Sequence, residues 1–173
     1  MYRHGRLASL DEPSGRHFRF SYTYFTEKGY RLTQIDMTRV ASGRMYHVGS
    51  YGYSDTGQLI TAAAADGVPW RYVYEDRLLV RETNRNGLNF HFIYAGTTPN
   101  AQCIHTWGDG GIYDHTLTYL DHVTLVKDSY GAETVYEWND LGVVTRITDA
   151  YGGSSAFEYD EAGQLVSETD PLG

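Results

Sequence analysis

The amino-acid sequence predicts an all-β protein, in which tandem β-hairpins form a curved, twisted antiparallel sheet. Tyrosine and glycine are abundant, with 16 Tyr and 19 Gly among 173 residues, and these residue types favour strands and turns over helices. Segments of about 20 residues recur along the chain, each with an aromatic strand followed by a glycine-containing turn. A repeat this short holds one hairpin, and no single hairpin can bury its aromatic face alone.

The clearest repeat covers residues 156–173. Phe157 and Tyr159 are two positions apart, so in a strand they share one face. Gly163 can adopt the positive φ of the following turn, after which the chain returns as a second strand. Trp138 occupies the position of Tyr159 one repeat earlier. The repeat unit is therefore predicted to be one β-hairpin.

Equivalent positions in the other repeats give two sets of residues with shared roles. One set is expected to stack between successive hairpins: Phe20, Tyr22, Tyr53, Tyr74, Tyr94, Tyr119, Trp138 and Tyr159. The other set is expected to form turns, with Asp bonding nearby backbone groups and Gly supplying positive φ: Asp55, Gly57, Gly67, Gly87, Asp140, Gly142, Gly152, Asp160, Gly163, Asp170 and Gly173.

The first part of the chain follows the same pattern. Residues 1–15 resemble the second half of a hairpin, so the domain 1–173 is expected to start within a repeat and to hold about seven repeats without a linker. From Arg16 onward aromatic and polar residues alternate, which predicts a strand, and residues 26–29 are expected to form its turn.

The return strands show a spacing that strict alternation does not explain. Leu32 and Ile35 are three residues apart, as are Val144 and Ile147, which would place the members of each pair on opposite faces. A β-bulge or a strong local twist in the return strand would reconcile this spacing with a shared face.

The middle repeats are less regular. Residues 51–59 are a close copy that carries Ser54 where later copies have Asn139 and Asp160. The repeat at residues 70–86 is shorter and has Glu75 and Asp76, without glycine, at its turn.

Composition excludes several functions. The formal net charge of -8 argues against binding to nucleic acid or to anionic membranes, because phosphate groups require a basic surface. The single Cys103 cannot form an internal disulfide. No apolar run is long enough to span a bilayer, so no membrane insertion is expected.

Residues with potential chemistry do not form a recognisable site. His and Asp residues gather near the turn at residues 107–111, but their spacing matches no zinc or calcium motif, and we expect solvated side chains: His105, Asp109, Asp114, His115 and His122. The acids that recur at turn positions are expected to cap backbone N–H groups rather than to act in catalysis. We therefore expect no catalytic residue, no metal and no cofactor.

The repeats resemble the YD repeat of the Rhs family. The motif Tyr-x-Tyr-Asp-x-x-Gly-x-Leu, followed by Asp-x-x-Gly, is similar to residues 51–59, 136–149 and 157–173, with Ser54 and Asn139 in place of the motif's Asp in two copies. Residues 103–113 also resemble the core of bacterial Rhs proteins. The resemblance covers essentially the whole chain.

This resemblance implies a structural, non-enzymatic role. In Rhs proteins, as in insecticidal toxin complexes and teneurins, many hairpins form a hollow shell, and in bacterial polymorphic toxins the shell holds a C-terminal toxin until delivery, commonly by type VI secretion in interbacterial competition. The chain would be one segment of such a wall, without the toxin domain. The expected partners are further Rhs repeats or a second polypeptide that completes the shell, the enclosed toxin and the secretion machinery.

The resemblance also implies a bacterial protein that is made in the cytoplasm and then secreted or injected. The isolated segment is expected to self-associate, because a shell segment leaves strand edges and an inner face uncovered. The alternative is a carbohydrate-binding YD-repeat module that uses exposed aromatic rings to stack on sugars.

Overall fold

The computed structural model describes residues 1–26 and 28–173, which divide into two compact units, Met1–Asn89 and Phe90–Gly173. Strands account for 62% of the residues and helix for 2%, which confirms the all-β prediction. The turn expected at residues 26–29 includes Glu27, which lies outside the described residues. In the described part of the chain, no helix is long and apolar enough to cross a membrane.

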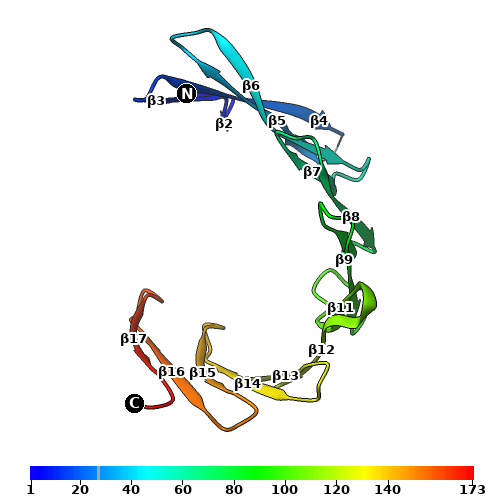
Figure 1. Cartoon of the computed structure of the whole chain (residues 1–173), viewed down its shortest axis with the longest axis vertical. Coiled ribbons are helices and arrows are strands. Elements are labelled where there is room, and N and C mark those ends of the chain that lie inside the picture. Colours follow the sequence, from blue (N-terminus) through cyan, green and yellow to red (C-terminus); the bar gives the residue numbers. More distant parts are fainter. Residues whose placement is uncertain (27) are drawn as a thin grey trace. The chain divides into compact units, whose positions relative to one another are not determined.

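In the first unit, β3 to β9 follow one another in the sheet in chain order, each antiparallel to the next (Figure 1). A separate small hairpin, β1 with β2, precedes them. The strands are β1 (Tyr2–Arg3), β2 (Arg6–Leu7), β3 (Ser9–Glu12), β4 (Arg16–Phe25), β5 (Gly29–Arg39), β6 (Arg44–Tyr53), β7 (Leu59–Ala64), β8 (Pro69–Glu75) and β9 (Leu78–Thr83).

The second unit repeats this meander, again with antiparallel pairing between strands that are neighbours in sequence. A short 3-10 turn, η1 (Asp109–Gly111), lies between two of its strands. The strands are β10 (Asn89–Tyr94), β11 (Cys103–Gly108), β12 (Ile112–Leu120), β13 (Val123–Lys127), β14 (Glu133–Trp138), β15 (Val144–Thr148), β16 (Ser154–Tyr159) and β17 (Leu165–Thr169).

Neither unit has an enclosed hydrophobic core. Leu78, at 8% exposure, is the one described hydrophobic residue that counts as buried. Most other strand residues are half-buried, because each strand touches chiefly its two neighbours and no second layer covers the sheet. Stability must therefore come from contacts between adjacent hairpins, as in other repeat proteins.

A β-bulge recurs in the return strands. The register shifts at the end of these hairpins leave one residue of the return strand without a cross-strand partner: Thr33, Ile60, Val80, Ile104, Thr145 and Val166. The bulges at Thr33 and Thr145 confirm the prediction made from the three-residue spacings. Bulges strengthen the local right-handed twist, so their repetition twists each sheet at regular intervals.

Two of the bulged residues also satisfy backbone acceptors. The Thr33 hydroxyl donates to the carbonyl of Ser21 at 3.3 Å, and the Thr145 hydroxyl donates to the carbonyl of Glu137 at 3.4 Å. In both hairpins, the accepting residue stands immediately before the aromatic residue at which the register shifts. A threonine at the bulge thus supplies a donor where the ladder is interrupted.

Seven of the described turns follow one five-residue pattern, in which a side-chain oxygen at the first position accepts a backbone N–H group two residues later, four residues later, or both. Asp160 shows both bonds, from Ala162 at 2.9 Å and from Gln164 at 2.8 Å. Ser54, Asn84, Asp128, Asn139, Asp149 and Asp170 make one or both of the equivalent bonds. Such bonds hold the reversal without help from other hairpins.

The turn glycines expected from the sequence all have φ between 73° and 89°, a region that favours glycine. They are Gly57, Gly67, Gly87, Gly142, Gly152, Gly163 and Gly173. In two copies, however, the capping oxygen lies one residue earlier than expected, on Ser54 rather than Asp55 and on Asn139 rather than Asp140. The reason is that the cap stands three residues before the glycine, whichever residue type occupies that position.

The turn between β8 and β9 reverses the chain without glycine. Glu75 pairs with Leu78, so only Asp76 and Arg77 form the loop. Their φ angles are 46° and 70°, as a type I′ hairpin turn requires at both central positions. This turn lies outside the five-residue pattern, as does the two-residue turn at residues 121–122 between β12 and β13.

The position of the cap can be tested at Asn139. We expect Asn139→Ala to lower the free energy of unfolding by about 1 kcal/mol, because two backbone N–H groups lose their acceptor. Asp140→Ala is the matched control at the next position, where the side chain is exposed, and it should change stability by less than about 0.5 kcal/mol. Urea unfolding followed by circular dichroism gives both values, and a larger loss in Asp140→Ala would contradict the assignment.

Candidate functional site

The eight aromatic residues expected to stack lie on one face within each unit, which we call the aromatic face. In the first unit, the aromatic face extends from β4 to β8, because cross-strand partners lie on the same face of the sheet. It includes Phe20, Tyr22, Tyr53 and Tyr74. In the second unit, it runs from β10 to β16 and includes Tyr94, Tyr119, Trp138 and Tyr159. Polar residues such as Arg19, Gln34 and Asp36 lie on the other face in the first unit.

Every one of these eight rings is half-buried. By contrast, Tyr130 and Tyr151, at turn tips, are 95% and 99% exposed. In six hairpins, an aromatic residue of the first strand stands where the register shifts at the bulge: Tyr22, Tyr53, Tyr74, Tyr94, Trp138 and Tyr159. The bulge and the aromatic residue therefore form one recurring structural unit.

Three tyrosine hydroxyls connect neighbouring hairpins. Each donates a hydrogen bond to a backbone carbonyl of the preceding hairpin: Tyr22 to Leu7 at 2.9 Å, Tyr53 to Leu32 at 2.9 Å, and Tyr119 to Cys103 at 2.8 Å. Leu32 and Cys103 stand immediately before bulged residues, Thr33 and Ile104. Tyr53 and Tyr119 thus each tie one hairpin to the bulge of the hairpin before it.

The electrostatics of these tyrosines suit this role. Burial raises the pKa of Tyr53, Tyr74 and Tyr119 above the usual value for tyrosine. Nearby Glu82 raises the pKa of Tyr74 further. The raised pKa extends to more alkaline pH the range in which the hydroxyls of Tyr53 and Tyr119 are protonated and can donate their bonds.

The His and Asp residues near the second-unit turn form separate pairs. His105 Nε2 lies 2.8 Å from Asp114 Oδ1, while His115 Nδ1 lies 2.8 Å from the Tyr113 carbonyl. His122 Nε2 lies 3.5 Å from Asp140 Oδ1. Among the described residues, no group of three or more His, Cys, Asp and Glu side chains could hold a metal ion.

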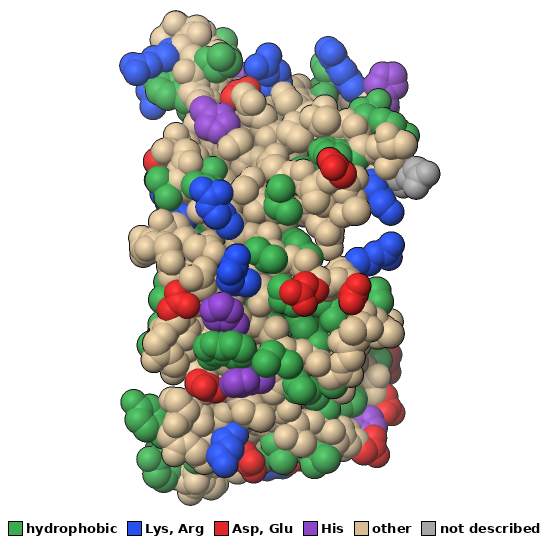
Figure 2. Space-filling view, turned by 90° about the vertical axis from the view of Figure 1, so that its right-hand side faces the viewer, with side chains coloured by type: hydrophobic (Ala, Val, Ile, Leu, Met, Phe, Trp, Pro, Cys, Tyr) green, Lys and Arg blue, Asp and Glu red, His purple; other side chains and the backbone are tan. Residues whose placement is uncertain are grey.

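His105 belongs instead to a stack of three rings. Trp107 lies between His91 and His105, with ring centroids 5.1 Å and 4.6 Å away. His91 in turn approaches Asp109, with Nε2 3.3 Å from Oδ1. Histidine and hydrophobic side chains adjoin on the face shown in Figure 2. Both imidazole rings thus stack with Trp107, whose side chain is half-buried.

A buried acid lies on the polar face of the first unit, and sequence reasoning missed it. Asp36 is only 4% exposed and accepts bonds from Gln34 at 2.8 Å and 2.9 Å and from Arg19 at 3.1 Å. His47 Nδ1 lies 3.4 Å away. The Gln34 bonds lower the pKa of Asp36 most, burial opposes them, and Arg19 and His47 lower it further. Alternation along β4 and β5 indicates which residues of each strand share a face. Only the pairing register shows that Arg19 of β4 and Asp36 of β5 lie opposite each other.

The fold and the aromatic face define the class of this protein: an array of antiparallel β-hairpins joined by bulges and by tyrosine–carbonyl bonds. Sequence comparison adds that the model of the RHS Repeat family matches residues 138–173. The match confirms the resemblance to the Rhs/YD-repeat family and identifies the C-terminal part of the chain as an RHS repeat. No curated protein matches the sequence.

Several solved structures are similar at low identity. The chain resembles a TcdB2-TccC3-TEV structure at 12% identity and a TM-score of 0.45, covering 88% of this chain and 10% of that chain. A Photorhabdus luminescens Tc holotoxin pore is similar at 11% identity and a TM-score of 0.39, covering 88% and 11%. A porin-like protein from Bacteroides uniformis is similar at 14% identity and a TM-score of 0.48, covering 92% and 84%. The chain spans about a tenth of the length of the Tc toxin chains.

The tyrosine–carbonyl bond can be tested at Tyr53. We expect Tyr53→Phe to lower the free energy of unfolding by about 1 kcal/mol, because the Leu32 carbonyl loses its donor while the ring remains. Tyr151→Phe removes a hydroxyl from a fully exposed ring and serves as the control, with no expected change. Thermal melts of the two variants give the comparison, and equal stability would mean that the bond contributes nothing.

The Asp36 cluster makes stability depend on pH. Because the folded pKa of Asp36 is lowered, its contribution is complete above the unfolded value of 3.8 and disappears as the pH falls through the folded value. Asp36→Asn is expected to cost about 2 kcal/mol at pH 7 and progressively less below pH 4. Asp55→Asn, at an exposed position, is the control. Unfolding measured from pH 7 to pH 2 should show the two curves of wild type and Asp36→Asn converging, and parallel curves would refute the assignment.

Proposed function

We propose that this chain is a non-enzymatic wall segment of an Rhs-type shell. The observation that carries the proposal is the repeated junction on the aromatic face, where half-buried rings and tyrosine–carbonyl bonds join successive hairpins. Side chains that connect one hairpin to the next have a structural role rather than a catalytic one. The RHS repeat at residues 138–173 supports the same role.

The open sheet explains which partners such a segment needs. Large hydrophobic residues in both units stay half-buried or exposed, so further surface must cover them in a stable assembly. Additional Rhs repeats, or a second polypeptide that completes the wall, would supply that cover. Without them, the isolated chain is expected to self-associate. The complete shell would enclose a C-terminal toxin, made in the bacterial cytoplasm and exported by type VI secretion.

Carbohydrate binding is the alternative that the aromatic residues raise. A sugar platform needs open ring faces and free hydroxyls, whereas Tyr22, Tyr53 and Tyr119 use their hydroxyls on backbone carbonyls. Trp138→Ala separates the two functions. If Trp138 joins hairpins, the variant should lose about 2–3 kcal/mol of stability, somewhat less than a fully buried ring, and bind glycans no differently on an array.

The encapsulation proposal is tested on the natural gene product. Mass spectrometry of the native protein is expected to show a chain many times longer than 173 residues, with a domain beyond the repeats. Limited proteolysis should leave that domain intact inside the assembled protein and cleave it rapidly when it is expressed alone. Equal cleavage in both cases, or a native product no longer than this chain, would overturn the proposal. Export that persists after loss of type VI secretion would overturn the delivery route alone.

A further inference from the structure

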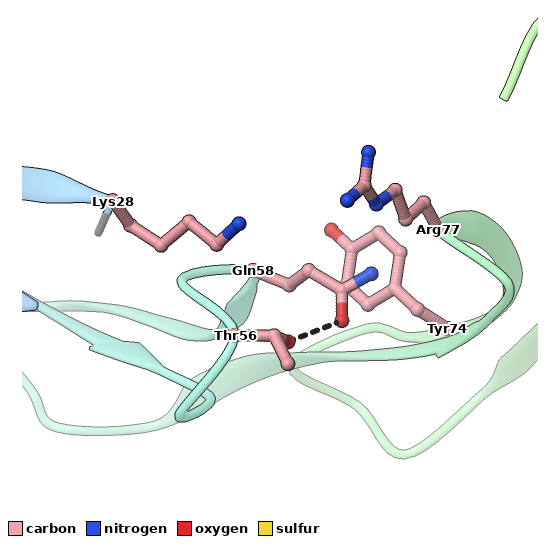
Figure 3. Close-up of a pocket in the computed structure, with 5 residues that line it drawn as sticks. All are labelled: Lys28, Thr56, Gln58, Tyr74 and Arg77. Carbon is pink, nitrogen blue, oxygen red and sulfur yellow. Dashed lines mark hydrogen bonds between the residues drawn. The ribbon is translucent and has the colours of Figure 1, made fainter. Parts of the chain in front are cut away.

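A hollow of about 510 Å³, lined by five residues with polar or charged groups, lies on the first unit. Its lining comes from three turn regions: Lys28 before β5, Thr56 and Gln58 between β6 and β7, and Tyr74 and Arg77 at the β8–β9 turn. Figure 3 shows the Lys28 and Arg77 side chains extending into the same space from opposite sides, with Gln58 and Tyr74 between them. Residues about 50 positions apart in sequence thus converge on one cavity of a size typical for small-molecule sites.

The hydrogen bonds at the floor of the hollow orient the Gln58 amide. The Thr56 hydroxyl donates to Gln58 Oε1 at 3.0 Å and accepts a bond from Ser54 Oγ at 2.8 Å. Ser54 Oγ in turn accepts the backbone N–H of Gln58 at 3.1 Å. The amide oxygen is therefore engaged within the turn, which leaves the Nε2 amide group to face the hollow (Figure 3).

Lys28 is held over this turn by a close backbone approach. A Cβ atom at Gly57 would lie 3.0 Å from Lys28 Cβ and 3.1 Å from Lys28 Cγ, closer than side chains normally approach. The absence of a side chain at Gly57 therefore allows the Lys28 stem to cross the turn and direct its ammonium group into the hollow. Arg77 reaches the same space from the two-residue turn between β8 and β9 (Figure 3).

The groups that face the hollow are almost all donors. Lys28 and Arg77 carry full positive charges, Gln58 offers N–H groups, and burial keeps the Tyr74 hydroxyl protonated by raising its pKa. In the part of the chain that the structure describes, the Lys and Arg ion pairs involve Arg16, Arg19, Arg85 and Arg146, not these two cations. Two cations outside these ion pairs, beside several donors, stand out in a chain of net charge -8.

We propose that this hollow binds a dianionic oxyanion of the phosphate or sulfate class, carried as an ester on a small molecule or as the free ion. Such a group accepts hydrogen bonds and donates almost none, so it matches the lining, and its two charges balance Lys28 and Arg77. The volume of about 510 Å³ exceeds that of an inorganic ion and leaves room for the body of an ester beside the Tyr74 ring.

Isothermal titration of the 173-residue chain with inorganic phosphate, sulfate, glucose 6-phosphate and acetate tests this site. We expect millimolar binding of the dianions, tighter binding of the ester, weaker binding of acetate, and loss of affinity as NaCl increases. Lys28→Gln and Arg77→Gln should each weaken phosphate binding about tenfold, or about 1.4 kcal/mol. Lys127→Gln, which removes a cation from the second unit, should leave it unchanged.

Gln58→Glu provides a second variant that keeps the size of the side chain. It places a carboxylate between the two cations, so it should abolish phosphate binding while the melting temperature stays the same or rises. Equal affinity in wild type, Lys28→Gln and Arg77→Gln would overturn the site. An equal loss in Lys127→Gln, or acetate binding as tight as phosphate binding, would show that only the general charge of the surface is being measured. Ester binding no tighter than phosphate binding would assign the site to the free ion.

Discussion

A sheet without a second layer has no interior, so each hairpin must be held by the hairpins on either side. The bulge in the return strand marks the position at which neighbouring hairpins are joined. It interrupts the ladder beside an aromatic residue of the first strand. At two of the bulges, a tyrosine of the next hairpin donates to the carbonyl of the residue before the bulged one, as Tyr53 does to Leu32. The twist, the stacking and the connection between repeats all depend on this junction.

The two faces of the sheet stabilise it through different interactions. The aromatic face connects hairpins through rings and hydroxyls, while the polar face of the first unit connects β4, β5 and β6 through Asp36. A buried carboxylate is stable only when its acceptors are filled, and Gln34 and Arg19 fill them. Because the polar cluster joins side chains of three strands, it links β4, β5 and β6 in one register.

Much of the fold follows from local sequence rules, and the exceptions are informative. The repeat length, the alternating strands and the bulges at Thr33 and Thr145 were all predictable, because each corresponds to a regular spacing of residue types in the sequence. The caps at Ser54 and Asn139 were assigned to the next residues, Asp55 and Asp140, because aspartate was preferred as the capping residue although Ser54 and Asn139 align with the motif's Asp. The Asp36 cluster and the Lys28–Arg77 hollow were beyond prediction, because they depend on which strands become neighbours and in what register.

The stabilising interactions therefore act over two distinct ranges. Turn caps join residues two to four positions apart, such as Asp160 with Gln164, and can form in an isolated hairpin. The tyrosine bonds join residues 15 to 21 positions apart and form only when two hairpins meet. No described element depends mainly on a strand distant in sequence, so each unit gains stability one junction at a time, as expected for a one-dimensional repeat array. A variant that breaks one junction should then loosen the adjoining hairpins first, while the turns within each hairpin remain formed.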